Sequence, residues 1–137
     1  MKITKSLILI SAIVFAKASL AHSDYLHTMT GSHGGKMEQA VQYRIELCLR
    51  SDEINVYVAD HERNGVAVET KDASVMALVT SGSGTQTIEM QPSDGNLLKA
   101  TQRLNLAPDT EIVVRLVFSQ QTPVQAVFRR ARIQNCS

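Results

Sequence analysis

The apolar residues between positions 42 and 61 recur at every second position, in two separate runs. The first run covers residues 43–49 and the second covers residues 54–58. A period of two is typical of a β-strand with one buried face. Because only the polar segment 50–53 separates the two runs, we expect them to pair as an antiparallel hairpin.

Further extended segments follow this hairpin at intervals of about ten residues, and each is bounded by a turn sequence such as Asn64-Gly65. They cover residues 66–68, 74–80, 85–90, 97–106, 111–118 and 124–133. No helical periodicity occurs among them. The pattern predicts an all-β fold, an immunoglobulin-like antiparallel β-sandwich of seven or eight short strands. Since the chain has no tryptophan, this prediction rests on strand count alone.

The first 21 residues have the composition of a cleaved signal peptide. Lys2 and Lys5 provide a basic start, and residues 7–16 form an apolar run before small residues. This run is too short to cross a membrane, which needs roughly 20 apolar residues, and no later stretch is longer. Cleavage fits after Ala18 or after Ala21, and the distance from the apolar run favours Ala21. We therefore expect an exported protein without a membrane span.

Cleavage after Ala21 divides the remaining chain into a flexible arm, residues 22–40, and one sandwich domain, residues 41–137. The signal carries three of the 14 basic residues and none of the 13 acidic ones. The exported form therefore has 11 basic and 13 acidic residues, a net charge of −2 with neutral histidines. A nucleic-acid partner is disfavoured, because binding phosphates needs a basic surface.

Two cysteines, Cys48 and Cys136, remain after cleavage. Cys48 lies on the polar face of its strand beside Glu46, so it does not have the position of an ordinary core thiol. An even number of cysteines in an oxidising compartment indicates a disulfide. We predict a bond that ties the end of the chain to the first hairpin; the alternative is two unpaired thiols.

The arm concentrates side chains that bind soft and borderline metal ions. Imidazole suits copper, zinc and nickel, and the methionine thioether suits Cu(I). We predict a metal site, most plausibly for copper, to which His61 adds a ligand from the end of a strand. The candidate ligands are His22, His27, Met29, His33, Met37 and His61. The alternative is a mobile polar arm, with His61 solvated at a turn that Asp60 caps.

Catalysis has little support in the sequence. The chain contains neither a Gly-x-Ser-x-Gly element nor a His-Glu-x-x-His zinc motif. We therefore predict that the protein is not an enzyme.

Several motifs resemble those of small exported bacterial proteins that are associated with tripartite, proton-driven heavy-metal efflux systems. They are His33-Gly34-Gly35, Tyr43-x-Ile45-Glu46-Leu47, Ile54-x-Val56-Tyr57-Val58-x-Asp60-His61, Leu78-Val79-x-Ser81-Gly82 and Asp94-Gly95-Asn96-x-Leu98-x-Ala100. The resemblance covers residues 32–118 approximately. This chain departs from the pattern in its longer turn at residues 62–65 and in its two cysteines.

The resemblance implies a setting in periplasmic metal homeostasis. We therefore predict a periplasmic metal-binding accessory protein that buffers copper or transfers it to an efflux pump. The alternative is an interaction module without metal, which docks on an efflux adaptor or another envelope protein.

Overall fold

The computed structural model describes residues 30–82, 84–130, 133 and 135–136. This part of the chain forms nine β-strands and no α-helix. The strands are β1 (Lys36–Ala40), β2 (Tyr43–Leu49), β3 (Glu53–Asp60), β4 (Val66–Ala67), β5 (Ala73–Ser81), β6 (Gly84–Pro92), β7 (Leu97–Thr101), β8 (Glu111–Phe118) and β9 (Val124–Arg129). The predicted all-β antiparallel sandwich is confirmed, and β8 has the bounds that the sequence predicts.

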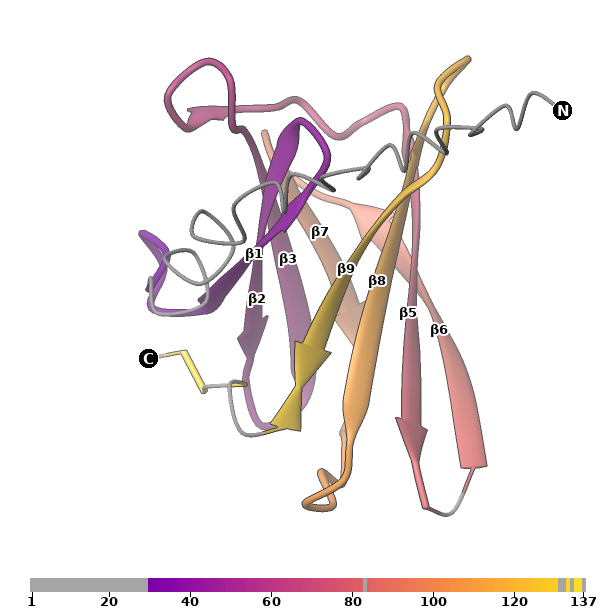
Figure 1. The fold of residues 1–137 in the computed structure, drawn as a ribbon. Helices are drawn as coiled ribbons and strands as arrows, with labels where there is room; N and C mark the ends of the chain where they lie inside the picture. Colours follow the sequence, from indigo (N-terminus) through magenta and orange to yellow (C-terminus); the bar gives the residue numbers. More distant parts are fainter. Residues whose placement is uncertain (1–29, 83, 131–132, 134, 137) are drawn as a thin grey trace, which may run out of the picture.

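The strands pack as two layers that face each other (Figure 1). The order is β1-β2-β3-β7-β6-β5-β8-β9, with β4 beside β3, and every pairing between strands is antiparallel. The last residues of β6, Gln91 and Pro92, pair with β7 and join the two layers. On the opposite side β1 lies beside β9, and Tyr43 Oη donates to Gln121 Oε1 at 2.9 Å. The sheet is therefore nearly closed.

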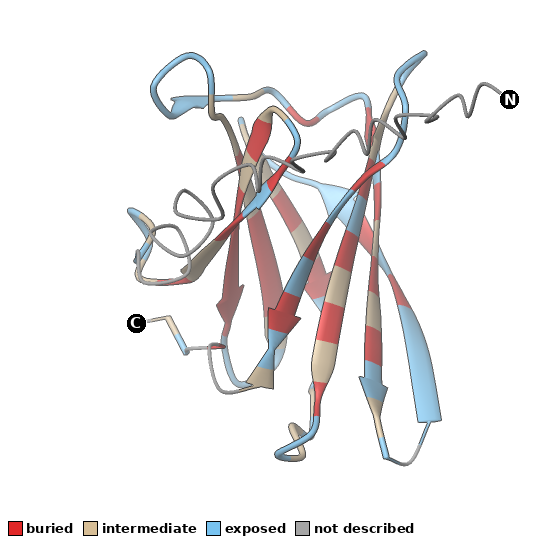
Figure 2. Cartoon of the chain, viewed as in Figure 1, coloured by how far each residue is buried: buried red, intermediate tan, exposed pale blue. Residues whose placement is uncertain are grey.

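The core lies between the layers and contains the alternating apolar side chains (Figure 2). In β9, Val124, Ala126 and Phe128 are buried while the residues between them are exposed. Alternation follows because successive side chains of a strand point to opposite faces. The largest fully buried side chains include Phe128, Ile45 and Leu116.

Strand β2 departs from this alternation, because both of its faces are buried from Ile45 to Leu49. Its inner face contributes Ile45, Leu47 and Leu49 to the core. Its outer face carries Glu46 and Cys48, which are also buried, with exposed fractions of 5% and 1%. The segments that cover this outer face form the candidate site.

The sandwich begins before residue 41, where the sequence places its boundary. Residues 36–40, expected in the flexible arm, form β1 and pair with β2 along their whole length. Residues 30–35 form a turn that is closed by a bridge between Thr30 and Lys36. Residues 22–29 of the predicted arm, and the predicted signal peptide, lie outside the described residues.

Candidate functional site

A buried carboxylate on the outer face of β2 organises the site. Glu46 Oε1 accepts the backbone N–H groups of His33 and Gly35, each at 2.9 Å. Both donors belong to the turn of residues 30–35, which we call the glycine turn. Because a buried carboxylate is costly unless hydrogen bonds compensate it, these donors account for its burial and fix the turn to the strand.

The His33 side chain lies between Glu46 and Tyr57. Its Nδ1 is 2.9 Å from Glu46 Oε2 and 3.2 Å from Ser32 Oγ. The imidazole stacks on the Tyr57 ring with centroids 3.5 Å apart and planes 3° from parallel. Since a carboxylate only accepts hydrogen bonds, Nδ1 of His33 is the donor, and Nε2 of the neutral ring keeps a free lone pair. The side chain of His33 is 40% exposed.

Two glycines allow the turn to approach β2 this closely. A Cβ atom at Gly31 would clash with the carboxyl group of Glu46, and one at Gly35 would lie 2.8 Å from Cys48 Sγ. Position 34 requires glycine for a different reason, because its backbone φ of 85° is in the left-handed region that favours glycine. Two of the three glycines that suggest mobility in the sequence, Gly31 and Gly35, are thus required here by close packing.

A pocket of about 480 Å³ opens beside His33. Met37 contributes to its lining and pairs with Glu46 in the register between β1 and β2. The other side chains that line it include those of Arg44 and Tyr57. The structure therefore brings two predicted ligands, His33 and Met37, into one pocket around a buried carboxylate.

His61 follows β3 and lies near this pocket without lining it. Arg44 Nε donates a hydrogen bond to His61 Nδ1 at 2.9 Å. In a neutral imidazole the other nitrogen then carries the proton, so His61 has no free lone pair for a metal ion. A role as ligand would require Arg44 to move away.

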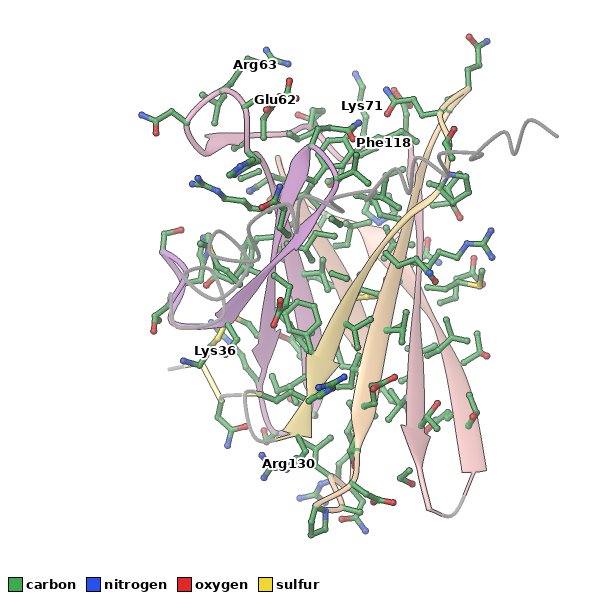
Figure 3. The ribbon with its side chains drawn as sticks, viewed as in Figure 1. Lys36, Glu62, Arg63, Lys71, Phe118 and Arg130 are labelled. Carbon is green, nitrogen blue, oxygen red and sulfur yellow. A yellow bond between two sulfur atoms is a disulfide. The ribbon has the colours of Figure 1, made fainter. Side chains whose placement is uncertain are left out.

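Asp60 caps the turn after β3, as the alternative interpretation of His61 expects. Its Oδ1 accepts the backbone N–H groups of Glu62 and Arg63 at 2.9 and 3.0 Å, and its Oδ2 accepts from Arg63 Nε at 3.0 Å. The hydrogen bond from the backbone of Arg63 is the main cause that lowers the pKa of Asp60, and the Arg63 side chain adds to it. In Figure 3 Glu62 and Arg63 project from this turn, away from the sandwich.

The remaining candidate ligands, His22, His27 and Met29, lie outside the described residues. Within the described residues no group of three or more His, Cys, Asp or Glu side chains is placed to hold a metal ion. Sequence reasoning assigned no role to Arg44 or Glu46 and treated Tyr57 as a packing residue. The one available indication was that Glu46 and Tyr57 occur in the motifs on which the resemblance rests.

The predicted disulfide between Cys48 and Cys136 is confirmed, with Cα atoms 5.3 Å apart. The backbone N–H of Cys136 donates to the carbonyl of Leu49 at 3.0 Å, so the end of the chain lies against β2. Cys48 Sγ lies 3.7 Å from the carbonyl oxygen of His33. The disulfide is therefore part of the support under the glycine turn.

Comparison with known proteins assigns no family to this chain. No family model matches the sequence, and no curated protein matches it. Among solved structures, one titled "Crystal structure of Br derivative BhCBM56" matches with a TM-score of 0.41 and 12% identity, over 69% of this chain and 98% of that chain. In the described residues no helix is long and apolar enough to cross a membrane.

Proposed function

We propose that this protein is an exported metal-binding accessory protein, with copper as the most plausible ion, and that His33 is its central ligand. The observation that carries the proposal is the hydrogen bond between His33 Nδ1 and the buried carboxylate of Glu46. A carboxylate in this position fixes the tautomer and orientation of a ligating imidazole and makes it more basic. The stacked Tyr57 ring restricts rotation of the imidazole further.

The chemistry of the second donor supports Cu(I). Met37 lines the same pocket as His33, and a thioether sulfur is a soft ligand that prefers Cu(I). Arg44 also lines this pocket, and its positive charge opposes a cation. Because the Glu46 carboxylate offsets that charge, the local balance before metal binding is near neutral. Under this proposal His22, His27 and Met29 supply further donors.

The proposed setting is the periplasm, where the protein would buffer copper or pass it to an efflux system. The predicted signal peptide, residues 1–21, and the disulfide support an oxidising compartment. The resemblance to exported proteins associated with metal efflux supports this particular use.

Calorimetric titration of residues 22–137 with Cu(I) and Cu(II) tests the proposal, with His33→Ala and His61→Ala as matched variants. We expect His33→Ala to weaken Cu(I) binding by more than about 100-fold, because loss of a residue that only supports a ligand already costs about 10- to 100-fold. We expect His61→Ala to weaken binding by less, because Arg44 occupies its Nδ1 atom. A parent protein that binds no copper, or a His33→Ala variant that binds as tightly as the parent, would contradict the proposal.

The second candidate is an interaction module that docks on an envelope protein without using a metal. It is favoured by the absence of a three-ligand cluster among the described residues. Failure to bind Cu(I), Cu(II), Zn(II) and Ni(II) in the same titration would leave this function as the better explanation.

A further inference from the structure

The outer face of the layer β9-β8-β5-β6 carries apolar side chains at positions where a strand that faces water usually carries polar ones. An antiparallel sheet with one solvated face normally alternates apolar and polar residues, whereas strands that are covered on both faces are apolar throughout. In β8 and β5 the buried core positions alternate with further apolar residues that point outward. The outward-facing apolar residues of this layer, which we call the apolar patch, are Met76, Leu78, Val113, Val117 and Val127.

The strand register makes the apolar patch continuous. Val113 pairs with Leu78 on one side and with Val127 on the other, so these three side chains form one row across β5, β8 and β9. Met76 lies next to Leu78 on the same face of β5, and Val117 extends the patch along β8. Because neighbouring strands lie about 4.8 Å apart, the row is about 10 Å wide.

No described strand lies over the apolar patch, because every described strand belongs to one of the two layers. The outer face of the other layer is covered at β2 by the glycine turn and by the end of the chain, which the disulfide joins to Cys48. Figure 2 shows much less pale blue along β8 than along β6, although Val127 beside β8 is 42% exposed. The layer β9-β8-β5-β6 therefore has an outer face suited to contact, and the described part of the chain supplies none.

Arg115 is the charged residue within the patch, between Val113 and Val117 on the outer face of β8. Its partners in the register are Met76 and Gln125, neither of which is charged. Among the described residues no carboxylate lies at ion-pair distance from its guanidinium group. A molecule that covered the patch would remove this charge from water, and a buried charge is costly unless it is paired. The patch therefore favours a partner that brings an acidic group to Arg115.

We propose that the apolar patch binds an amphipathic helix of another protein, and that an acidic side chain of this helix pairs with Arg115. The width of the patch matches one helix, which measures about 10–12 Å across with its side chains. Along β8 the patch extends about 13 Å from Val113 to Val117, which corresponds to roughly two and a half helical turns. An acidic residue of the helix can then meet Arg115, with apolar residues one turn before and one turn after it on the same face.

Charge and width disfavour the other occupants of such a face. A second copy on a two-fold axis over the patch would bring two Arg115 side chains together, and like charges that face each other are destabilising. An anionic lipid surface would meet the carboxylates of Glu89 and Glu111, which flank the patch on β6 and β8. A second β-sheet would extend beyond the apolar row, because β6 presents Thr85, Thr87 and Glu89 on this face.

Methyl NMR titration of metal-free residues 22–137 with a synthetic helical peptide tests the proposal. The peptide has about 20 residues, because shorter isolated helices are marginal in water, and carries one glutamate with leucines one turn before and one turn after it. We expect it to shift the methyl signals of Met76, Leu78 and Val113, with a dissociation constant of about 100 µM, as for a small interface. Arg115→Glu should weaken binding at least about tenfold, and a peptide with lysine in place of its glutamate should restore binding to this variant.

Matched variants separate this contact from general effects of charge and hydrophobicity. Arg50→Glu changes the net charge equally at an exposed arginine after β2, in the other layer, and should bind the peptide like the parent. Val127→Ser should weaken binding at least about threefold, whereas Val66→Ser, at an exposed valine of β4, should not. Circular dichroism should show that all variants are folded.

Four outcomes would overturn the proposal. They are no shift of the patch methyl signals, equal effects of Arg115→Glu and Arg50→Glu, no restoration by the lysine peptide, and contacts of the patch with residues 22–29 in the free protein. Because no metal is present, these results are independent of the proposed copper site.

Discussion

Glu46 binds His33 through both of its carboxylate oxygens. Oε1 accepts the backbone N–H of His33 and Oε2 lies at hydrogen-bond distance from the ring Nδ1, both at 2.9 Å. One buried side chain therefore fixes both the position of the residue and the orientation of its imidazole. This relationship explains how an exposed histidine in a turn rich in glycine is held in one orientation.

Glu46→Gln should weaken the proposed copper binding at His33 while the fold survives. The amide keeps an oxygen for the two backbone donors, but its NH₂ group would donate to Nδ1 and leave the proton of the imidazole on Nε2. We expect the free energy of unfolding to fall by about 1–3 kcal/mol, which is the usual cost of leaving a buried hydrogen-bonding group without a suitable partner. Nitrogen NMR of the imidazole should show the change of tautomer, and titration should show the loss of affinity.

The control for this substitution is Glu38→Gln, which changes another buried glutamate of the same layer. It should leave the tautomer of His33 unchanged. An unaltered imidazole spectrum in Glu46→Gln would show that Glu46 does not set the tautomer.

Gly31→Ala should destabilise the protein by about 1–3 kcal/mol, because its methyl group would collide with the carboxyl group of Glu46 in a closely packed site. Gly82→Ala is the matched control. Its added methyl would meet only the Asp109 carboxyl group, at 3.0 Å, and an exposed side chain can move aside. Urea denaturation of both variants measures the difference, and equal stability would mean that the glycine turn tolerates displacement from β2.

Replacing Cys48 and Cys136 together by alanine should lower the free energy of unfolding substantially. The bond joins residues 88 positions apart, and a loop of this size corresponds to about 4.6 kcal/mol in the chain-entropy model. Urea denaturation of the double variant and of the parent measures the loss. The parent treated with a reducing agent should approach the stability of the variant, and a loss below about 1 kcal/mol would contradict the chain-entropy account.

Asp60 should contribute to a loss of stability in acid. Hydrogen bonds from Arg63 and Glu62 lower its pKa in the folded state. A carboxyl group with a lowered folded pKa stabilises the protein above its unfolded pKa of about 3.9, and this stabilisation disappears as the pH falls through the folded pKa. Asp60→Asn should therefore reduce stability at pH 7 more than below pH 3, which denaturation at both pH values measures. An equal reduction at both pH values would show that the charge of Asp60 is not involved.

Local sequence pattern determined most of the strands, though not β1, and it determined which side chains of those strands face the core. These patterns act over only a few residues. Alternation in residues 43–49, 54–58 and 111–118 places one set of side chains in the core whatever the strand order is. The same parity placed Cys48 on the outer face of its strand, and the disulfide confirms the inference that it has a partner. The order of the strands depends on pairings between distant segments, such as β3 with β7, which no local pattern contains.

Tertiary structure decided the environment of the candidate site. Alternation places Glu46 on the outer face, where a sequence-based interpretation expects solvent; it is buried because the glycine turn folds over it. The glycines of this turn indicate flexibility when only backbone freedom is considered, but Gly31 and Gly35 are needed because Cβ atoms would collide with β2. Likewise, His61 is one of four histidines in the sequence, and only the position of Arg44 shows that its Nδ1 lone pair is occupied. These properties depend on contacts between segments, so the sequence alone could name the candidate ligands but could not distinguish between them.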